Sequence, residues 1–485
     1  MDDGGRRHCW ECQRRCLVCD STRPVCKRCS TSGVDCPGYG NVRPARLRWL
    51  PPGRVSSRRR KRNACDSLGD SSHYRITVPL VQFGHEANAL TQAVDYFNAC
   101  IYQDLVPVRE LGPNPNIYRL SATHLQRGVY FPDHLRFSLI CITLTHRINR
   151  TRGDQGSRDL VERFCHFWGI LIRSLSQDIE IQQRCTGDLV IAGIVTLLLC
   201  DIQQGSFPRW RVHVEGLQKL IRLRGGLRAL CGAHGLQSLL HSFVFTAVIG
   251  NTTCPASNLV MANEHLAELD FILETYGRRV IPFQTIPPLL FGEIVRINHL
   301  RMRAAQAGEG LSELLSHEAY AILARILNFS PDLWADSRST SREEWRLLAS
   351  IHQAATVLYC IGSMESQSLL PLNSPLRACR STQAQLLLRL LNEALSSAQT
   401  KLFVLWPLVV LGMAAVDGDA AMREFVVKRL QEISRYAGTC APLAARETLE
   451  RFWASGEKRW DACFDTPHVF TTQIAVDLSG LALVS

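Results

Sequence analysis

Six cysteines near the amino terminus constrain the fold of this chain more than any other feature of its sequence. They follow the pattern C-x2-C-x6-C-x6-C-x2-C-x6-C and are Cys9, Cys12, Cys19, Cys26, Cys29 and Cys36. Two separate tetrahedral zinc sites would need eight sulfur ligands, whereas six thiolates suffice if two sulfurs are shared. The spacing therefore predicts a metal cluster with four terminal and two bridging thiolates.

A seventh cysteine leaves another ligand set open. Cys16 forms a further C-x2-C pair with Cys19, so three such pairs could serve mononuclear sites, with His8 as an additional ligand. A disulfide framework is the other common use of clustered cysteines. The stretch before Cys9 is polar and no apolar segment of a secretory signal follows it. The other cysteines are scattered singly, which favours a reducing compartment.

The residues between the cysteines resemble those of the fungal zinc binuclear cluster (Zn2Cys6) transcription factors. The shared marks are Asp20 after the third cysteine, Arg23-Pro24 before the fourth, and the exit Cys36-Pro37-Gly38-Tyr39. The resemblance implies that residues 1–40 form a DNA-binding module. It also implies that the module holds two Zn²⁺ ions, with Cys9 and Cys26 as the bridging ligands.

A second resemblance covers the carboxy-terminal part of the chain. Residues 210–226 carry Trp210, His213, Gly216 and Arg224-Gly225-Gly226, which look like the W-x2-H…G…R-G-G signature of the fungal-specific transcription factor domain. Together the two resemblances cover about residues 5–38 and 85–480, and the subtype is that of the acriflavine-sensitivity control regulators. They imply a regulator rather than an enzyme, and the sequence contains no G-x-S-x-G, H-E-x-x-H or P-loop motif.

The resemblance also indicates which residues meet DNA. In the family a short helix after the second cysteine enters the major groove and binds a CGG-like, GC-rich site, and the matching residues here are Gln13, Arg14 and Arg15. Arg15 is the best candidate for a two-bond contact with guanine. Lys27 and Arg28 lie on the other half of the cluster, where phosphate contacts are expected.

Two residues depart from the family pattern, so the sequence does not decide whether this module shares the family's preference for CGG-like sites. Cys16 and Val18 stand where family members usually carry lysine or arginine, and neither donates strong hydrogen bonds to a guanine edge. An alternative function follows from this departure, namely a zinc-module interaction scaffold without sequence-specific DNA binding. A helical enzyme with an attached zinc module is a third hypothesis.

Positive charge is concentrated in the first part of the chain. Residues 1–62 contain 16 Lys and Arg against 5 Asp and Glu, whereas the remaining residues contain 39 of each, so the whole net charge of +11 lies in this segment. This distribution favours a polyanion as the partner of this segment, and the resemblance implies that this polyanion is double-stranded DNA. The basic run within it predicts nuclear import and hence a nuclear location, and its members are Arg58, Arg59, Arg60, Lys61 and Arg62.

Residues 41–84 are expected to form a basic, flexible linker. The first part contains Pro44, Pro51, Pro52 and Gly53, which disfavour a helix. No heptad repeat follows the basic run, so a coiled coil directly after the cluster is not expected. A homodimer, if the chain forms one, would therefore use the helical domain.

From about residue 85 the sequence predicts a mostly α fold, with one large all-helical regulatory domain over 85–485. Apolar residues recur there at steps of three and four, and proline and glycine separate the stripes. The longest apolar runs are shorter than the ~20 residues of a membrane span, so no membrane contact is expected. The resemblance implies that this domain regulates transcription, either by binding a small hydrophobic effector, by contacting transcriptional co-regulators or by masking the activation function. The predicted helices cover residues 87–101, 135–148, 160–175, 189–201, 212–223, 236–248, 266–276, 311–327, 345–361, 383–398, 403–416 and 421–436.

Overall fold

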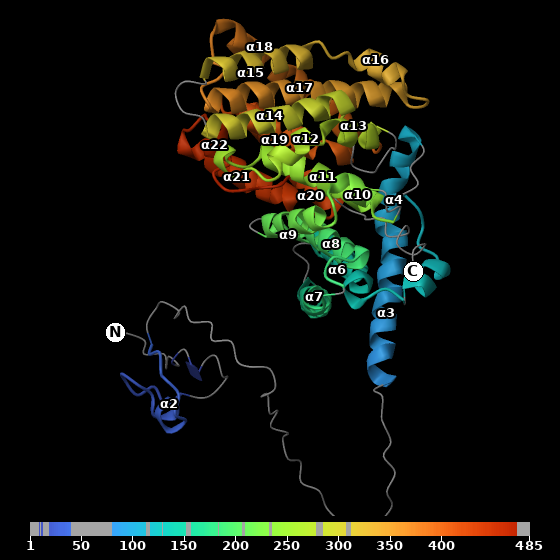
Figure 1. The fold of residues 1–485 in the computed structure, drawn as a ribbon, viewed down its shortest axis with the longest axis vertical. Coiled ribbons are helices and arrows are strands. Elements are labelled where there is room, and N and C mark those ends of the chain that lie inside the picture. Colours follow the sequence, from blue (N-terminus) through green and yellow to red (C-terminus); the bar gives the residue numbers. More distant parts are fainter. Residues whose placement is uncertain are drawn as a thin grey trace, which may run out of the picture. The chain divides into compact units, whose positions relative to one another are not determined.

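The chain divides into two units, residues 1–76 and 77–485, which are considered separately (Figure 1). A computed structural model describes residues 9, 11–12, 19–39, 80–112, 117–128, 130–151, 157–182, 184–205, 209–231, 235–277, 285–306 and 312–472.

The smaller unit is organised around its cysteines. Five of the six cysteines of the pattern are buried, and together with Cys36 and Tyr39 they form a cluster of their own, without an apolar core of the usual kind. The helix of this unit is α2 (Lys27–Thr31), which begins directly after Cys26. A segment of this size buries too little apolar surface for a core alone to stabilise it.

The larger unit is helical, and its described residues contain no strand. The predicted mostly α fold, with a cysteine-rich module before a large helical domain, is therefore confirmed. The helices are α3 (Leu80–Tyr96), α4 (Tyr102–Leu105), α5 (Ala122–Gly128), α6 (Asp133–Arg150), α7 (Ser157–Glu180), α8 (Asp188–Gln204), α9 (Trp210–Leu223), α10 (Leu227–Cys231), α11 (Gln237–Thr252), α12 (Ala262–Ala267), α13 (Leu269–Gly277), α14 (Pro288–Gln306), α15 (Ser312–Leu327), α16 (Pro331–Asp336), α17 (Arg342–Ser366), α18 (Ser374–Ser396), α19 (Leu405–Ala414), α20 (Ala420–Ala437), α21 (Ala441–Ser455) and α22 (Trp460–Cys463).

Helix α17 forms the centre of this unit. It packs against α14, α15, α16, α18, α19 and α22, and most of its residues are buried (Figure 1). Among the described helices it alone is long and apolar enough to cross a membrane, yet 83% of its most apolar window is buried inside the unit. Its burial on all sides is that of a core helix in a large helical domain.

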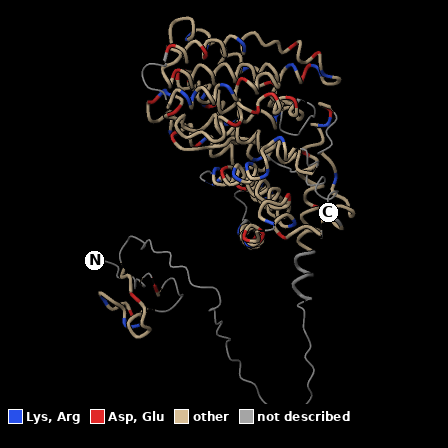
Figure 2. Tube along the Cα trace, in the orientation of Figure 1, with Lys and Arg blue, Asp and Glu red and all other residues tan. Residues whose placement is uncertain are grey.

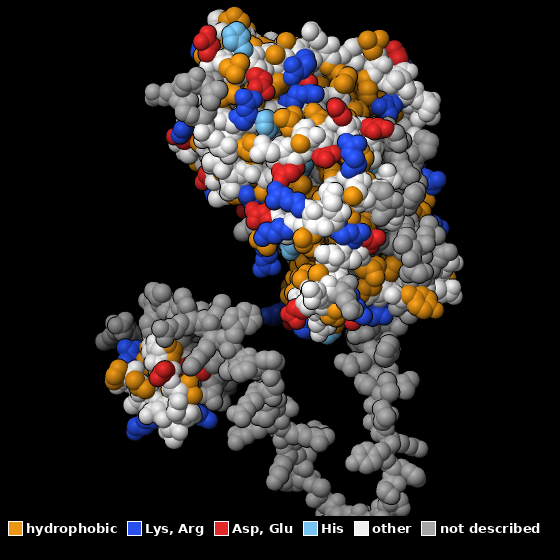
Figure 3. Space-filling model, in the orientation of Figure 1, with side chains coloured by type: hydrophobic (Ala, Val, Ile, Leu, Met, Phe, Trp, Pro, Cys, Tyr) orange, Lys and Arg blue, Asp and Glu red, His pale blue; other side chains and the backbone are white. Residues whose placement is uncertain are grey.

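A second group of helices surrounds α6 and α8. Helix α6 packs against α3, α7, α8 and α20, and α8 packs against α9 and α11. In Figure 1, α7 is seen end-on at the edge of the helical unit. Acidic and basic residues are intermixed over this unit, in keeping with its balanced charge (Figures 2 and 3).

A buried arginine, Arg301 of α14, lies among the helices that pack around α17. Its guanidinium donates to the carbonyl oxygen of Cys254 at 2.7 Å, to Asp461 Oδ1 at 2.7 Å and to the Tyr359 hydroxyl at 3.0 Å. Burial lowers the pKa of Arg301, but Tyr359 and Asp461 outweigh burial and raise the pKa above its ordinary value. The side chain therefore stays charged and ties α14, α17 and α22 together.

Each predicted helical stripe overlaps an observed helix, but two long helices were not predicted. Helix α14 was missed because Pro287 and Pro288 suggested a break, whereas Pro288 is the first residue of the helix. Proline is favoured at this position because its missing N–H would have no partner there. Helix α21 was also missed. Helix α3 begins at Leu80, inside the segment 41–84 expected to be a linker.

Candidate metal centre and nucleic-acid interface

The cysteines of the pattern converge from four places in the smaller unit, two C-x2-C pairs and two single cysteines. Cys9 and Cys26 are fully buried, Cys12 and Cys29 are 1% exposed, and Cys19 and Cys36 complete the set. Their sulfur atoms fall into two groups of four, and within each group the sulfurs lie within 4.8 Å of one another. The first group is Cys9, Cys12, Cys19 and Cys26, and the second is Cys9, Cys26, Cys29 and Cys36.

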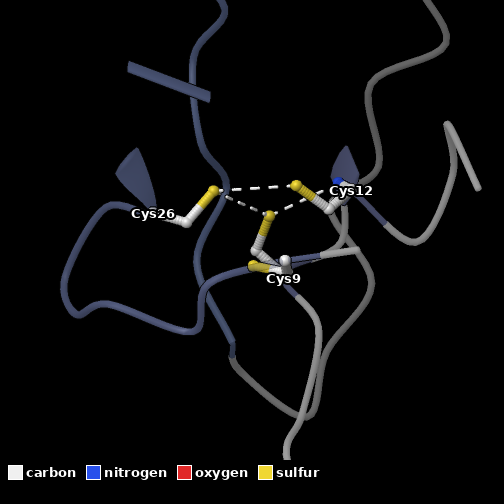
Figure 4. Close-up of side chains that lie close together, drawn as sticks. Cys9, Cys12 and Cys26 are labelled. Carbon is white, nitrogen blue, oxygen red and sulfur yellow. Dashed lines mark hydrogen bonds between the residues drawn. The ribbon is translucent and has the colours of Figure 1, made fainter. Parts of the chain in front are cut away.

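The spacing of the sulfur atoms fits a tetrahedral ion. The Sγ–Sγ distance is 3.6 Å for Cys9–Cys26, 3.7 Å for Cys12–Cys26 and 3.7 Å for Cys9–Cys29. A zinc–sulfur bond of about 2.3 Å in tetrahedral geometry places two ligand sulfurs about 3.8 Å apart. Figure 4 shows Cys9, Cys12 and Cys26 pointing their sulfurs toward one another. The donor set could hold metal, and its all-thiolate chemistry suits zinc.

The two C-x2-C pairs repeat the same local bond. The backbone N–H of Cys12 donates to the Sγ of Cys9 at 3.3 Å, and the N–H of Cys29 donates to the Sγ of Cys26 at 3.3 Å. In each pair the acceptor is the sulfur that belongs to both groups of four. Such donors fix the orientation of a ligand and stabilise its thiolate form.

Asp20 connects the two halves of the cluster. Its carboxylate accepts hydrogen bonds from the backbone N–H groups of Thr22 at 3.0 Å, Lys27 at 3.2 Å and Arg28 at 3.0 Å. The first two N–H groups of α2 thus find partners, and Cys26 accepts the third. Burial raises the pKa of Asp20, but these three donors outweigh it, so the pKa lies below its ordinary value.

Tyr39 closes the other side of the cluster. Its hydroxyl donates to the carbonyl oxygen of Thr22 at 2.9 Å and lies 3.4 Å from the Sγ of Cys19, while the Arg23 guanidinium lies 5.3 Å from its ring centre. Asp20, Arg23 and Tyr39 were noted in the sequence only as marks of resemblance. Sequence reasoning did not predict their contacts with the cysteine-bearing segments. Their closeness in sequence to the cysteines of the pattern could have suggested such contacts.

The predicted DNA-binding residues fall into two sets. Lys27 and Arg28 are exposed in the first turn of α2, next to the ligand Cys26. Gln13, Arg14 and Arg15 lie outside the described residues, as do Cys16 and Val18 and the basic run from Arg58 to Arg62.

In the larger unit, the signature residues form paired, packed contacts. His213 Nε2 lies 2.8 Å from Asp201 Oδ2, and Arg224 donates to Asp188 at 3.0 Å. Trp210 begins α9 and is buried.

Two cavities of this unit have volumes of about 10 and 20 Å³, which is room for a water molecule or little more. The small hydrophobic effector stays a prediction.

Comparison with known proteins agrees with the sequence signatures. Residues 93–465 match the fungal specific transcription factor domain. The chain is 47% identical over 494 residues to the phomenoic acid biosynthesis cluster-specific transcriptional regulator of Leptosphaeria maculans, an alignment that covers 99% of this chain and 92% of the relative. No solved structure matches the chain.

The predicted fungal transcription factor family is thereby confirmed. The assignment of the cysteine module to the zinc binuclear cluster class and the acriflavine-sensitivity subtype stay predictions. Both comparisons describe regulators and neither describes an enzyme. The chain belongs to the fungal-specific transcription factor domain family and is a transcriptional regulator.

Proposed function

We propose that this protein is a nuclear, zinc-dependent regulator that binds GC-rich, CGG-like DNA sites in genes transcribed by RNA polymerase II. The observation that supports it most is the pair of overlapping thiol groups, which share Cys9 and Cys26. Six sulfurs arranged in this way supply four ligands to each of two Zn²⁺ ions. The bound ions would act as structural cross-links that hold the short segments of the module together.

The protein's own residues would then present basic side chains to DNA. Asp20 fixes the start of α2 through Lys27 and Arg28, so these two side chains leave the cluster surface from a held backbone. Contacts of Lys27 and Arg28 with phosphates would position the module without carrying base information. Reading of a guanine is proposed for Arg15, supported by Arg14 and Gln13, through the two-bond geometry of guanidinium with guanine.

The relative suggests the genes under control. It is named as the cluster-specific regulator of phomenoic acid biosynthesis. We therefore propose that this chain also controls a biosynthetic gene cluster. Import into the nucleus is proposed for the run Arg58–Arg62, because a basic run of this length beside a DNA-binding module suits import receptors.

A selection of duplexes from a random pool by the zinc-loaded full-length protein tests the proposal. Enrichment of CGG-like sites is expected, and the enrichment should disappear when a Cys9→Ser, Cys26→Ser double variant replaces the wild-type protein. If the wild-type protein binds zinc but retains no duplex at low salt, the interaction scaffold becomes the better description.

A further inference from the structure

Helix α7 carries more apolar surface than its neighbours cover. One stripe faces α6 and α8 and is buried, with Leu160, Phe167, Leu171 and Leu175. A second stripe lies beside it at intervals of four, three, four and seven residues, which is the spacing of a helix–helix seam. Its members are Val161, Cys165, Trp168, Ile172 and Ile179.

The second stripe is open to solvent towards both ends of the helix and half-buried in between, where Trp168 and Ile172 pack against the core. Val161 and Ile179 are each 43% exposed, Cys165 is exposed, and Trp168 and Ile172 are half-buried. From Val161 to Ile179 the stripe spans 18 residues, or about 27 Å at 1.5 Å per residue. Because α7 lies at the edge of the helical unit (Figure 1), another molecule can reach it.

Helix α7 has a glycine, Gly169, near its middle, although the described residues around it leave room for a larger side chain. A Cβ built on Gly169 would meet only Arg173 Nη1, at 3.5 Å, which is an ordinary van der Waals contact. Glycine in a helix interior costs about 1 kcal/mol relative to alanine. Because glycine has no Cβ, it lets a second backbone approach closely at such a position.

The charged residues beside the stripe have opposite signs at corresponding positions before and after Gly169. From the amino end they are Arg158, Glu162, Arg173 and Glu180, all exposed, and among the described residues none of the four forms an ion pair. Arg158 and Glu180 each lie 11 residues from Gly169, on opposite sides. Two copies of α7 that crossed antiparallel at Gly169 would place Arg158 against Glu180 of the second copy, twice. Glu162 would meet Arg173 within one helical turn, whereas a parallel pair would oppose like charges.

We propose that α7 forms an antiparallel, two-fold symmetric contact with α7 of a second copy of this chain, centred on Gly169. One helix pair is smaller than a standard interface, so the dimer exchanges with monomer in solution. Its formation does not depend on the proposed DNA binding. Where DNA binding holds, two tethered modules on neighbouring half-sites would raise each other's effective concentration.

The first test separates dimer formation from folding. Sedimentation equilibrium of the full-length protein should show a concentration-dependent dimer. Gly169→Ala should raise the melting temperature, because it removes a helix-interior glycine, and yet weaken the dimer at least tenfold. A wild-type protein that stays monomeric at all concentrations, or a Gly169→Ala protein that dimerises as wild type does, would overturn the proposal.

The second test fixes the orientation of the two helices. Arg158→Glu and Glu180→Arg should each weaken self-association at least tenfold at low salt, because each opposes like charges twice. An equimolar mixture of these two variants should form a heterodimer of wild-type affinity, since every cross-helix pair is then complementary. Failure of the mixture to associate would overturn the antiparallel contact.

A variant outside α7 serves as a control for the location of the interface. Leu333 in α16 is 74% exposed and lies outside α7, so Leu333→Glu adds a charge to another exposed apolar position. This variant should leave the dimer unchanged. If Leu333→Glu abolishes the dimer while the α7 variants keep it, the contact lies elsewhere and the proposal is wrong.

Discussion

The Sγ atoms of Cys9 and Cys26 lie 3.6 Å apart, and these two sulfurs belong to both groups of four thiols in the smaller unit. Each also accepts the backbone N–H of the cysteine three residues later, at 3.3 Å. The two halves of the module are thus built alike around a shared pair. A cluster with common ligands would require this arrangement, whereas two independent tetrahedral sites would require eight separate thiols.

The shared pair predicts unequal effects of cysteine substitutions. Cys9→Ser or Cys26→Ser removes a ligand from both groups, whereas Cys12→Ser removes one from a single group. After dialysis against a weak chelator, native mass spectrometry should find no zinc on the Cys9→Ser or Cys26→Ser protein and at least one ion on the Cys12→Ser protein. Cys185→Ser, far from the cluster in sequence, serves as the control and should keep the wild-type zinc content. Equal losses for Cys9 and Cys12 would argue against shared ligands.

Asp20 is predicted to strengthen metal binding although it is not a ligand. Asp20→Asn cannot accept all three backbone N–H bonds, so zinc affinity should fall about 10- to 100-fold, as for other residues that hold metal ligands. Because the folded protein lowers the pKa of Asp20, its contribution is complete at neutral pH and is lost only as the pH falls through the lowered value. The Asp20→Asn protein, which lacks this carboxylate, should therefore begin to release zinc at a higher pH than the wild-type protein.

An acid titration of zinc content with a chromogenic chelator would measure this shift. Asp35→Asn provides the matched control, since Asp35 is an exposed aspartate of the same unit. Identical release curves for Asp20→Asn and the wild-type protein would show that the three backbone bonds contribute nothing to metal retention.

Arg301 is predicted to be the most sensitive charged residue of the helical unit. Arg301→Met removes the hydrogen bonds to Cys254, Tyr359 and Asp461 and leaves a carboxylate without its partner. Loss of one partner of a buried pair costs about 3–5 kcal/mol. Urea denaturation followed by circular dichroism should show this loss. Arg342→Met, at an exposed arginine, should leave the free energy of unfolding close to the wild-type value.

Two glycines with left-handed backbone predict different responses to alanine. Gly438 (φ +59°) ends α20, and a Cβ there would clash with the ring of His146, whereas Gly456 (φ +75°) has open space around it. Gly456→Ala should cost about 1–2 kcal/mol from the backbone alone. Gly438→Ala should cost about 1–3 kcal/mol more, because the core is overpacked. Thermal melts of the two variants give the difference, and similar melting temperatures would contradict the packing around His146.

The sequence was sufficient for features that depend on local spacing. The intervals between cysteines anticipated that the thiols would gather in one place, and steps of three and four anticipated most helices. Helix α14 was missed because proline breaks a helix in its interior but is favoured at its first residue. The sequence alone did not show that Pro288 occupies the first position. The contacts of Asp20 join residues seven and eight positions apart through a turn whose path the sequence does not specify. No local pattern distinguishes the buried Arg301 from exposed arginines, because its burial depends on four segments meeting.

The zinc content of the purified full-length protein tests the central claim most directly. Metal analysis by inductively coupled plasma mass spectrometry, referred to a protein concentration from amino-acid analysis, gives the number of ions per chain. Ligand sharing by Cys9 and Cys26 predicts two zinc ions per chain. One ion per chain, or none, would contradict it.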